Sequence, residues 1–264
     1  MKVFNIQMNI DQHNPNNNYA TAERWIRKAH EEGADVVVLP ELWNTAFHMS
    51  EKLFELADKD GVRTKQFFSS LSKELHINIV GGSVTVLEDE KIYNRCYVYD
   101  REGSQIAEYD KVHLFSFSGE ENYFAKGDKV GFFELDGRKC GIIICYDIRF
   151  PEWVRLYALS DVEVLFCVSE WPIKRIPHWK APTQTRAIEN QLFLVGCNFA
   201  SLTTKGKFAG ESAIFDPWGV NIANHLEEDG LVYGEIDFDK LKKIRTTLNV
   251  YQDRRTSLYD ISFK

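Results

Sequence analysis

The fold of this chain is decided by the stretch Gly141-Ile142-Ile143-Ile144-Cys145-Tyr146-Asp147-Ile148-Arg149-Phe150-Pro151-Glu152-Trp153. Its first four residues are a glycine followed by three β-branched isoleucines, which predicts a buried strand. Pro151 suits the first turn of a helix because proline has no amide hydrogen to leave unpaired. We therefore expect a helix from Glu152 to Leu159 and place Cys145 at the elbow between strand and helix.

A cysteine at this elbow has two interpretations. Open α/β sheets place their chemistry at the carboxyl ends of strands, which is where Cys145 lies. Backbone amides of the next residues point nearby and can hold a developing oxyanion, so the position suits a nucleophile. The alternative is a small apolar core residue, as unpaired cysteines usually are. The elbow alone leaves both interpretations open.

Length and charge narrow the class of protein. A chain of 264 residues can bury a core large enough for one domain, and we expect a single domain over residues 1–264. The net charge of −7 comes without any long basic run, which argues against a nucleic-acid partner. Residues 1–10 alternate polar with apolar, and about 18 consecutive apolar residues occur nowhere. We expect no membrane association and a soluble, cytoplasmic protein.

The cysteines and histidines give no sign of a metal site. Five cysteines cannot all pair with one another, and four of them lie in apolar, strand-like runs where we expect them to be packing residues. Neither a Cys-x-x-Cys pair nor a His-x-x-x-His spacing is present. The sequence therefore predicts metal-free chemistry.

The rest of the chain predicts a mixed α/β fold. Asn16-Asn17-Asn18 offers capping residues for a helix over 19–32. The continuous apolar run at 36–39 predicts a strand that is buried on both faces, so helices or a second layer must cover the sheet. Other expected helices cover 62–75, 178–190 and a short segment to Thr247 capped by Asp239, and expected strands cover 2–8, 35–39, 77–80, 91–99, 106–109, 132–135, 162–168, 193–198 and 231–236. We expect two βα-rich halves that stack sheet on sheet, with the helices outside.

Two further strand ends carry chemical groups. Glu41 follows an apolar strand and a proline, and Lys111 follows the strand that ends near Tyr109. We expect Glu41, Lys111 and Cys145 to converge at one edge. A thiol needs a base near neutral pH, which a partly desolvated glutamate can supply, and an ammonium can face the oxyanion together with the amide of Tyr146. Taken singly, Glu41 could cap a loop and Lys111 could simply be solvated.

The three segments together have a specific resemblance. Leu39-Pro40-Glu41, Tyr109–Leu114 and Cys145–Pro151, in this order, resemble the Glu, Lys and Cys motifs of the nitrilase superfamily of carbon-nitrogen hydrolases. The resemblance covers nearly the whole chain and continues through 186–190, 196–198 and 216–219.

The resemblance implies a four-layer α-β-β-α sandwich with mixed sheets, a homodimer, and amide hydrolysis through a thioester without metal or cofactor. Glu41 would be the general base, Lys111 the oxyanion stabiliser and Cys145 the nucleophile. A second glutamate is expected in the loop after the lysine motif. Glu120 is favoured for this place over its neighbour Glu121.

The residues after the cysteine select a branch of the superfamily. Nitrilases proper have Trp-Glu there, whereas this chain has Tyr146-Asp147 and resembles the ω-amidases, which act on 2-oxoglutaramate or 2-oxosuccinamate. Arg149 gives a physical reason for such a substrate, because a guanidinium can hold the carboxylate of a dicarboxylate monoamide in bidentate fashion. The alternative for Arg149 is a structural salt bridge. Tyr146 and Trp171 are expected to contact the substrate, and other candidates for the pocket wall are Phe117, Tyr123 and Phe199.

Three other readings stay open. One is a different amide or carbamoyl hydrolase of the same family. Another is a Cys-His enzyme with His113 as the base, in which replacing His113 by Asn would abolish activity rather than spare it. The third is a non-catalytic ligand-binding member, although a scaffold has no physical need for a converging thiol, carboxylate and ammonium.

Overall fold

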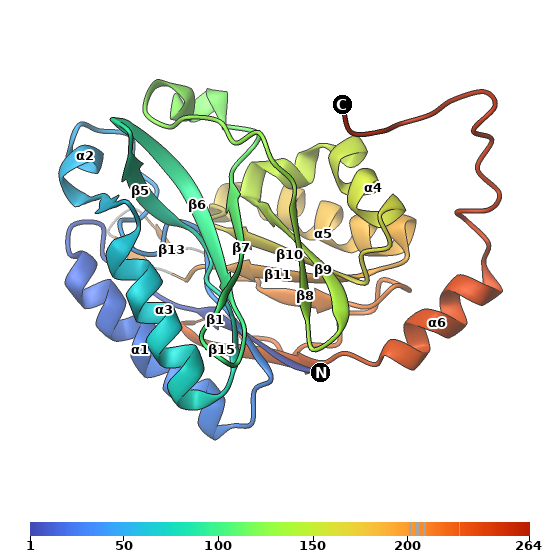
Figure 1. Ribbon diagram of the computed structural model, residues 1–264, viewed down its shortest axis with the longest axis horizontal. Coiled ribbons are helices and arrows are strands. Elements are labelled where there is room, and N and C mark those ends of the chain that lie inside the picture. The colour runs from blue at the N-terminus through green and yellow to red at the C-terminus, as the bar shows by residue number, and fades with distance from the viewer. Residues whose placement is uncertain (201, 204–205, 208–209, 227) are drawn as a thin grey trace.

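The computed structural model describes residues 1–200, 202–203, 206–207, 210–226 and 228–264. Within these residues the strands form an eight-stranded sheet, a five-stranded sheet and a separate two-stranded ribbon, β12 (Leu202–Thr203) with β13 (Gly206–Lys207). Figure 1 shows the two large sheets packed against each other, with helices on their outer sides.

The eight-stranded sheet is built from the first half of the chain and one late strand. Its order is β15-β1-β2-β4-β6-β5-β3, with β7 paired to β6. Strands β1, β2 and β4 are parallel, whereas β15 runs antiparallel to β1. The bounds are β1 Lys2–Gln7, β2 Val36–Val38, β3 Asp58–Lys59, β4 Asn78–Val80, β5 Val84–Glu88, β6 Lys91–Tyr99, β7 Gln105–Asp110 and β15 Gly230–Glu235.

The five-stranded sheet has the order β14-β11-β10-β9-β8. Its three central strands are parallel, and β8 and β14 are antiparallel to their neighbours. The bounds are β8 Gly131–Leu135, β9 Arg138–Ile144, β10 Val164–Ser169, β11 Phe193–Asn198 and β14 Ala213–Phe215.

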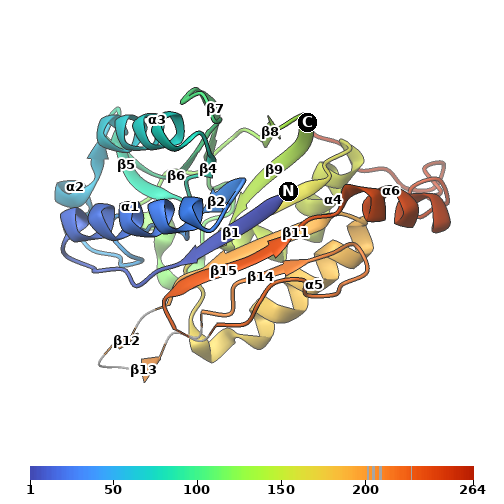
Figure 2. The same ribbon diagram turned by 90° about the horizontal axis from the view of Figure 1, so that it is seen from below.

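Helices cover the outer faces of both sheets (Figure 2). The long helices α1 (Pro15–Glu31) and α3 (Val62–Leu75) lie on the eight-stranded sheet, and α4 (Pro151–Leu159) and α5 (Pro177–Asn190) lie on the five-stranded sheet. Between the sheets, side chains from both inner faces form one buried cluster that includes Val36, Val38, Ile142, Ile144 and Phe166. The expected four-layer α-β-β-α sandwich with mixed sheets is confirmed.

Several boundaries differ from the sequence-based expectation. Helix α1 begins at Pro15, because the side chain of Asn14 caps it by accepting from the Asn17 amide at 3.1 Å. Asn18 is instead buried inside the helix. Helix α6 (Phe238–Thr247) is capped by Asp237 and not by Asp239. Strands β3 and β5 and the short helix α2 (Lys52–Leu56) were not predicted.

The chain after α6 extends along the outside of the molecule (Figure 1). Residues 248–264 contain neither helix nor strand. Among the helices of the described residues, none combines the length and the apolar character needed to cross a membrane.

Candidate active site

Cys145 lies where the sequence placed it. Strand β9 ends at Ile144, a 3-10 turn covers Cys145–Arg149, and α4 begins at Pro151. Cys145 has φ 47°, a left-handed conformation that non-glycine residues rarely adopt and that is concentrated at functional sites. It is half-buried, whereas the other four cysteines are buried and unpaired, as predicted.

The loop that carries Glu41 is held by the small residues that follow β4. Gly82 has φ 64°, and a Cβ there would lie 2.1 Å from the carbonyl oxygen of Pro40, so only glycine fits. The amide of Ser83 donates to this same carbonyl at 3.0 Å. Glu41 follows Pro40, is fully buried, and accepts from the backbone amide of Glu170 at 2.9 Å.

Lys111 lies between two glutamates. Its Nζ is 2.8 Å from Oε1 of Glu41 and 2.9 Å from each carboxylate oxygen of Glu120. All three side chains are fully buried. Lys111 leaves the end of β7 and Glu41 leaves the end of β2, so the two strand ends meet as expected.

Glu120 and Glu121 have different surroundings although they are neighbours. Glu120 is buried and accepts from the backbone amide of Phe115 at 2.6 Å, whereas Glu121 is exposed. Asn94, on β6, joins Glu120 to Glu41 by donating from one amide nitrogen to both carboxylates, at 3.3 and 2.9 Å. The sequence analysis missed Asn94, whose one signal is a short polar residue inside a predicted strand.

Burial and charge set the protonation of this cluster. Burial alone would lower the pKa of Lys111, but Glu41 and Glu120 outweigh it, so the pKa is held well above its ordinary value. Burial, reinforced by Glu41, raises the pKa of the Cys145 thiol well above its ordinary value. Burial also raises the pKa of Glu120 against the effect of Lys111. The resting cluster therefore holds an ammonium and a neutral thiol, which needs a base before it can attack.

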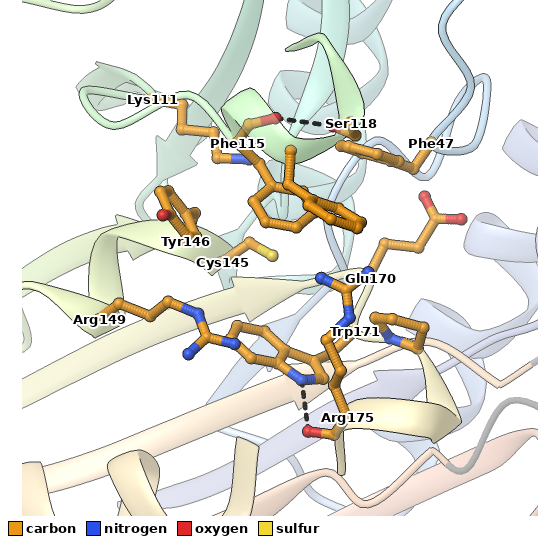
Figure 3. Close-up of a pocket in the computed structure, with 12 residues that line it drawn as sticks. Phe47, Lys111, Phe115, Ser118, Cys145, Tyr146, Arg149, Glu170, Trp171 and Arg175 are labelled. Atoms are coloured by element: carbon orange, nitrogen blue, oxygen red, sulfur yellow. Dashed lines mark hydrogen bonds between the residues drawn. The ribbon is translucent and has the colours of Figure 1, made fainter. Parts of the chain in front are cut away.

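Cys145 and Lys111 open into a cavity of about 300 Å³. Figure 3 shows the sulfur of Cys145 directed into it, with aromatic rings around. Its lining consists of Phe47, Lys111, Phe115, Phe117, Ser118, Cys145, Tyr146, Arg149, Glu170, Trp171, Pro172 and Arg175. This lining includes the three residues that the sequence predicts to contact the substrate, namely Tyr146, Arg149 and Trp171.

Only one of the other side chains predicted for the pocket wall lines the cavity. Phe117 lines the cavity. Tyr123 packs against a small core cluster around Leu42 and Phe124, and Phe199 is buried in the core of the eight-stranded sheet and its helices. Sequence reasoning had no signal for Phe47, which comes from the loop after β2. Within the described residues, no group of three or more His, Cys, Asp or Glu side chains is arranged to hold a metal ion.

Within the described part of the chain, Arg149 is held by aromatic rings and not by a salt bridge. No carboxylate of the described residues lies within 4.0 Å of its guanidinium. The guanidinium lies 4.8 Å from the ring centroid of Trp171 and 5.9 Å from that of Tyr146, and one nitrogen is 3.4 Å from Nδ1 of His178. Stacking on aromatic faces leaves the N–H edges of a guanidinium free for an anion.

The imidazole of His113 is held by Asp147 and Phe150. Its Nδ1 lies 2.8 Å from Oδ1 of Asp147, and its ring stacks on Phe150 with centroids 3.8 Å apart. The same buried Asp147 accepts from the His113 amide, the Tyr109 hydroxyl and the Ile144 amide, at 2.9, 2.7 and 2.9 Å. These contacts tie His113 to the elbow as a structural residue.

Comparison with known proteins agrees with this geometry. The family model of carbon-nitrogen hydrolases matches residues 3–246. The chain is 42% identical over 254 residues to a 2-oxoglutaramate amidase of Bacillus subtilis (strain 168), covering 96% of this chain and 97% of the relative. It is 32% identical to an omega-amidase of Homo sapiens over 94% of this chain and 92% of the relative.

A solved structure shows the same architecture. Nit3 of Saccharomyces cerevisiae, a member of branch 10 of the nitrilase superfamily, superposes with a TM-score of 0.89 at 28% identity, covering 97% of this chain and 96% of that one. The motifs, the four layers and these similarities agree, and the chain belongs to the carbon-nitrogen hydrolases of the nitrilase superfamily.

Proposed function

We propose that this protein is an amidase that hydrolyses the terminal amide of a short dicarboxylate monoamide, such as 2-oxoglutaramate, through a thioester on Cys145. The observation that carries the substrate class is Arg149, which lines the cavity of Cys145 and has no carboxylate of its own among the described residues. The relative from Bacillus subtilis, a 2-oxoglutaramate amidase, supports the same class.

The first half of the reaction uses Glu41, Lys111 and Cys145. Glu41 takes the proton of the Cys145 thiol, and the sulfur attacks the amide carbon. The carbonyl oxygen becomes an oxyanion that Lys111 stabilises together with the backbone amide of Tyr146. Glu41 then gives its proton to the nitrogen, the carbon–nitrogen bond breaks, and ammonia leaves the thioester behind.

The second half releases the acid. Water loses a proton to Glu41 and attacks the thioester carbon, which again places negative charge on the oxygen near Lys111. The carbon–sulfur bond breaks, and the Cys145 thiolate recovers the proton from Glu41. Glu120 and Asn94 contact Lys111 or Glu41 and are proposed to hold both groups in place.

Ammonia release tests the proposal. Purified protein should release ammonia from 2-oxoglutaramate and from glutaramate, which lacks the 2-oxo group, much faster than from pentanamide, which has no carboxylate. Cys145→Ala should fold normally and release none. Turnover of pentanamide at an equal rate would indicate a different amidase of the family. Absence of turnover with every amide would leave a ligand-binding protein.

Arg149→Met tests the carboxylate contact. Loss of a buried charge-assisted pair typically costs about 2 to 5 kcal/mol, so kcat/KM for 2-oxoglutaramate should fall about thirtyfold or more. The rate with pentanamide should change little. If both rates fall equally, Arg149 serves the fold and not the substrate.

We further propose that the enzyme is a cytoplasmic homodimer. Five unpaired cysteines fit a reducing compartment.

The surface that we propose for the dimer contains Ile188, Trp218 and Val220, which are 45%, 53% and 52% exposed. They lie together, since a Cβ on Gly219 would touch Ile188. Apolar side chains grouped on a surface favour association. Light scattering should give twice the chain mass of 30.6 kDa, and Ile188→Asp should give monomers. A monomeric wild type would exclude the dimer.

A further inference from the structure

Arg175 is a second arginine of the cavity for which the sequence analysis had no role. It ends the 3-10 turn Ile173–Arg175, whereas Arg149 comes from the elbow after β9. Both arginines line the cavity of Cys145 and the groove that adjoins it. In Figure 3 the Arg149 side chain reaches from the left toward the Trp171 ring, and the Arg175 side chain rises beside Trp171 from below.

The side chain of Arg175 is held by aromatic contacts. Its guanidinium lies 4.9 Å from the ring centroid of Phe115 and 5.3 Å from that of Phe117. Its carbonyl accepts from Nε1 of Trp171 at 2.9 Å, and the Trp171 ring also carries Arg149. Trp171 therefore contacts the guanidinium of Arg149 and the backbone of Arg175. Aromatic faces leave the N–H groups of both guanidinium groups available.

Neither arginine has an ion-pair partner among the residues that the structure describes. Among the described residues, no carboxylate lies within 4.0 Å of the Arg175 guanidinium, as is also true of Arg149. Glu170 is the one carboxyl in the described lining, and burial, with the charge of Glu41, raises its pKa well above the ordinary value. Lys111 is already paired with Glu41 and Glu120. With Glu170 neutral, the two arginines therefore leave the cavity positively charged, which favours an anionic ligand.

We propose that Arg175 is a specificity residue that holds the 2-oxo-acid end of the substrate together with Arg149. A 2-oxo acid presents a carboxylate and an adjacent carbonyl oxygen, which is more acceptor capacity than one planar guanidinium satisfies. A second guanidinium can donate to the oxo oxygen. An amino acid amide such as glutamine carries an ammonium at this carbon, which a facing guanidinium repels.

This inference rests on the proposed function for its substrate, and paired substrates test it. Arg175→Met should lower kcat/KM for 2-oxoglutaramate about ten- to a hundredfold, chiefly through KM, as expected for loss of a charged hydrogen bond. Glutaramate, without the oxo group, should lose much less, so the preference for 2-oxoglutaramate should fall toward one. Glutamine should become a relatively better substrate.

Lys174→Met is the matched control, because Lys174 is the exposed neighbour of Arg175 in the same turn and its loss removes the same charge. It should leave the preference unchanged. An unchanged preference in Arg175→Met, or an equal loss in both variants, would overturn the inference.

Binding without turnover separates this inference from the proposed function. In the Cys145→Ala background, calorimetry should show that Arg175→Met weakens 2-oxoglutarate binding about tenfold or more and that Lys174→Met does not. If wild type hydrolyses no amide and this difference in binding remains, the proposed function fails and the anion-binding role of Arg175 stands. If hydrolysis occurs and binding is equal in both variants, the role of Arg175 fails alone.

Discussion

At the scale of single residues, the site depends on one buried cation. Lys111 compensates the carboxylates of Glu41 and Glu120, and all three side chains are fully buried. A buried charge without its partner is strongly unfavourable. The same ammonium is the proposed partner of the oxyanion. Both stability and catalysis therefore depend on Lys111. Glu41, in contrast, can be replaced by a neutral glutamine of the same shape.

Glu41→Gln and Lys111→Met should differ for this reason. Glu41→Gln removes the base and should slow ammonia release by about two to four powers of ten with little change in the melting temperature. Lys111→Met should lower kcat by a comparable factor and also destabilise the fold by about 3 to 5 kcal/mol, because two buried carboxylates lose their cation.

The exposed pair of Lys139 and Asp161, 3.7 Å apart, provides the control. Lys139→Met should change neither rate nor stability by a comparable amount. Denaturant unfolding and steady-state rates measure both effects. A near-normal rate in Glu41→Gln or Lys111→Met would remove that residue from the mechanism.

Glu170 should make stability depend on pH. Its pKa in the folded protein lies well above the ordinary value of 4.5, chiefly through burial, so the folded state binds the extra proton. Stability from this group is complete below the unfolded pKa and is lost as pH rises toward the folded pKa. Glu170→Gln has no carboxyl to titrate here, so it should not lose this stability as the pH rises. Its melting temperature should exceed that of wild type at pH 8, and the difference should shrink toward pH 5.

The exposed Glu121 provides the control for this titration. The melting temperature of Glu121→Gln should change with pH in the same way as that of wild type from pH 5 to pH 8. A constant difference between Glu170→Gln and wild type would mean that the Glu170 carboxyl titrates normally in the folded protein.

At the scale of elements, one aspartate joins the two segments that carry Lys111 and Cys145. Asp147 lies two residues after Cys145 and contacts residues two positions on either side of Lys111. It accepts from the Tyr109 hydroxyl and the His113 backbone amide, and its Oδ1 is 2.8 Å from Nδ1 of His113. It also accepts from the amide of Ile144. The end of β7 and the elbow after β9 are therefore fixed to each other through one buried carboxylate.

Asp147→Asn should disturb catalysis more than binding. An amide at this position keeps one acceptor oxygen and turns a donor toward groups that are themselves donors, so kcat should fall while KM changes little. Asp216 is the matched control, being fully buried and accepting two backbone amides at 2.9 Å elsewhere. Asp216→Asn should lower stability without lowering kcat of the folded enzyme. Equal kcat losses in both variants would mean that Asp147 acts only through the fold.

The contacts of His113 with Asp147 and Phe150 predict a structural role and not that of a catalytic base. His113→Asn loses the ring stacked on Phe150 and one hydrogen bond to Asp147, and most activity should remain. Complete loss of activity in a variant that still folds would support the Cys-His alternative.

At the scale of the whole molecule, the site is assembled across the two sheets. Glu41 and Lys111 follow strands of the eight-stranded sheet, and Cys145 follows β9 of the five-stranded sheet. The shared core between the sheets, which includes Val36 and Ile144, sets their distance. Packing of the inner faces therefore positions the proposed nucleophile against the proposed base.

The sequence by itself determined the features that depend on neighbouring residues. The apolar run before Cys145 and Pro151 after it predict an elbow, because strand and helix preferences act over a few residues. The non-alternating run at 36–38 likewise predicts a strand covered on both faces, and its residues are fully buried. Local rules also put Glu41 and Lys111 at strand ends.

Only the tertiary structure decided which side chains meet. Glu120 and Glu121 are chemically identical neighbours, and the difference between them comes from contacts with Lys111 and Phe115. Asn94 and Arg175 have no distinguishing local pattern, because their partners lie on other strands and turns. Such contacts depend on how the two sheets stack, and that is a property of the packed core and not of any single segment.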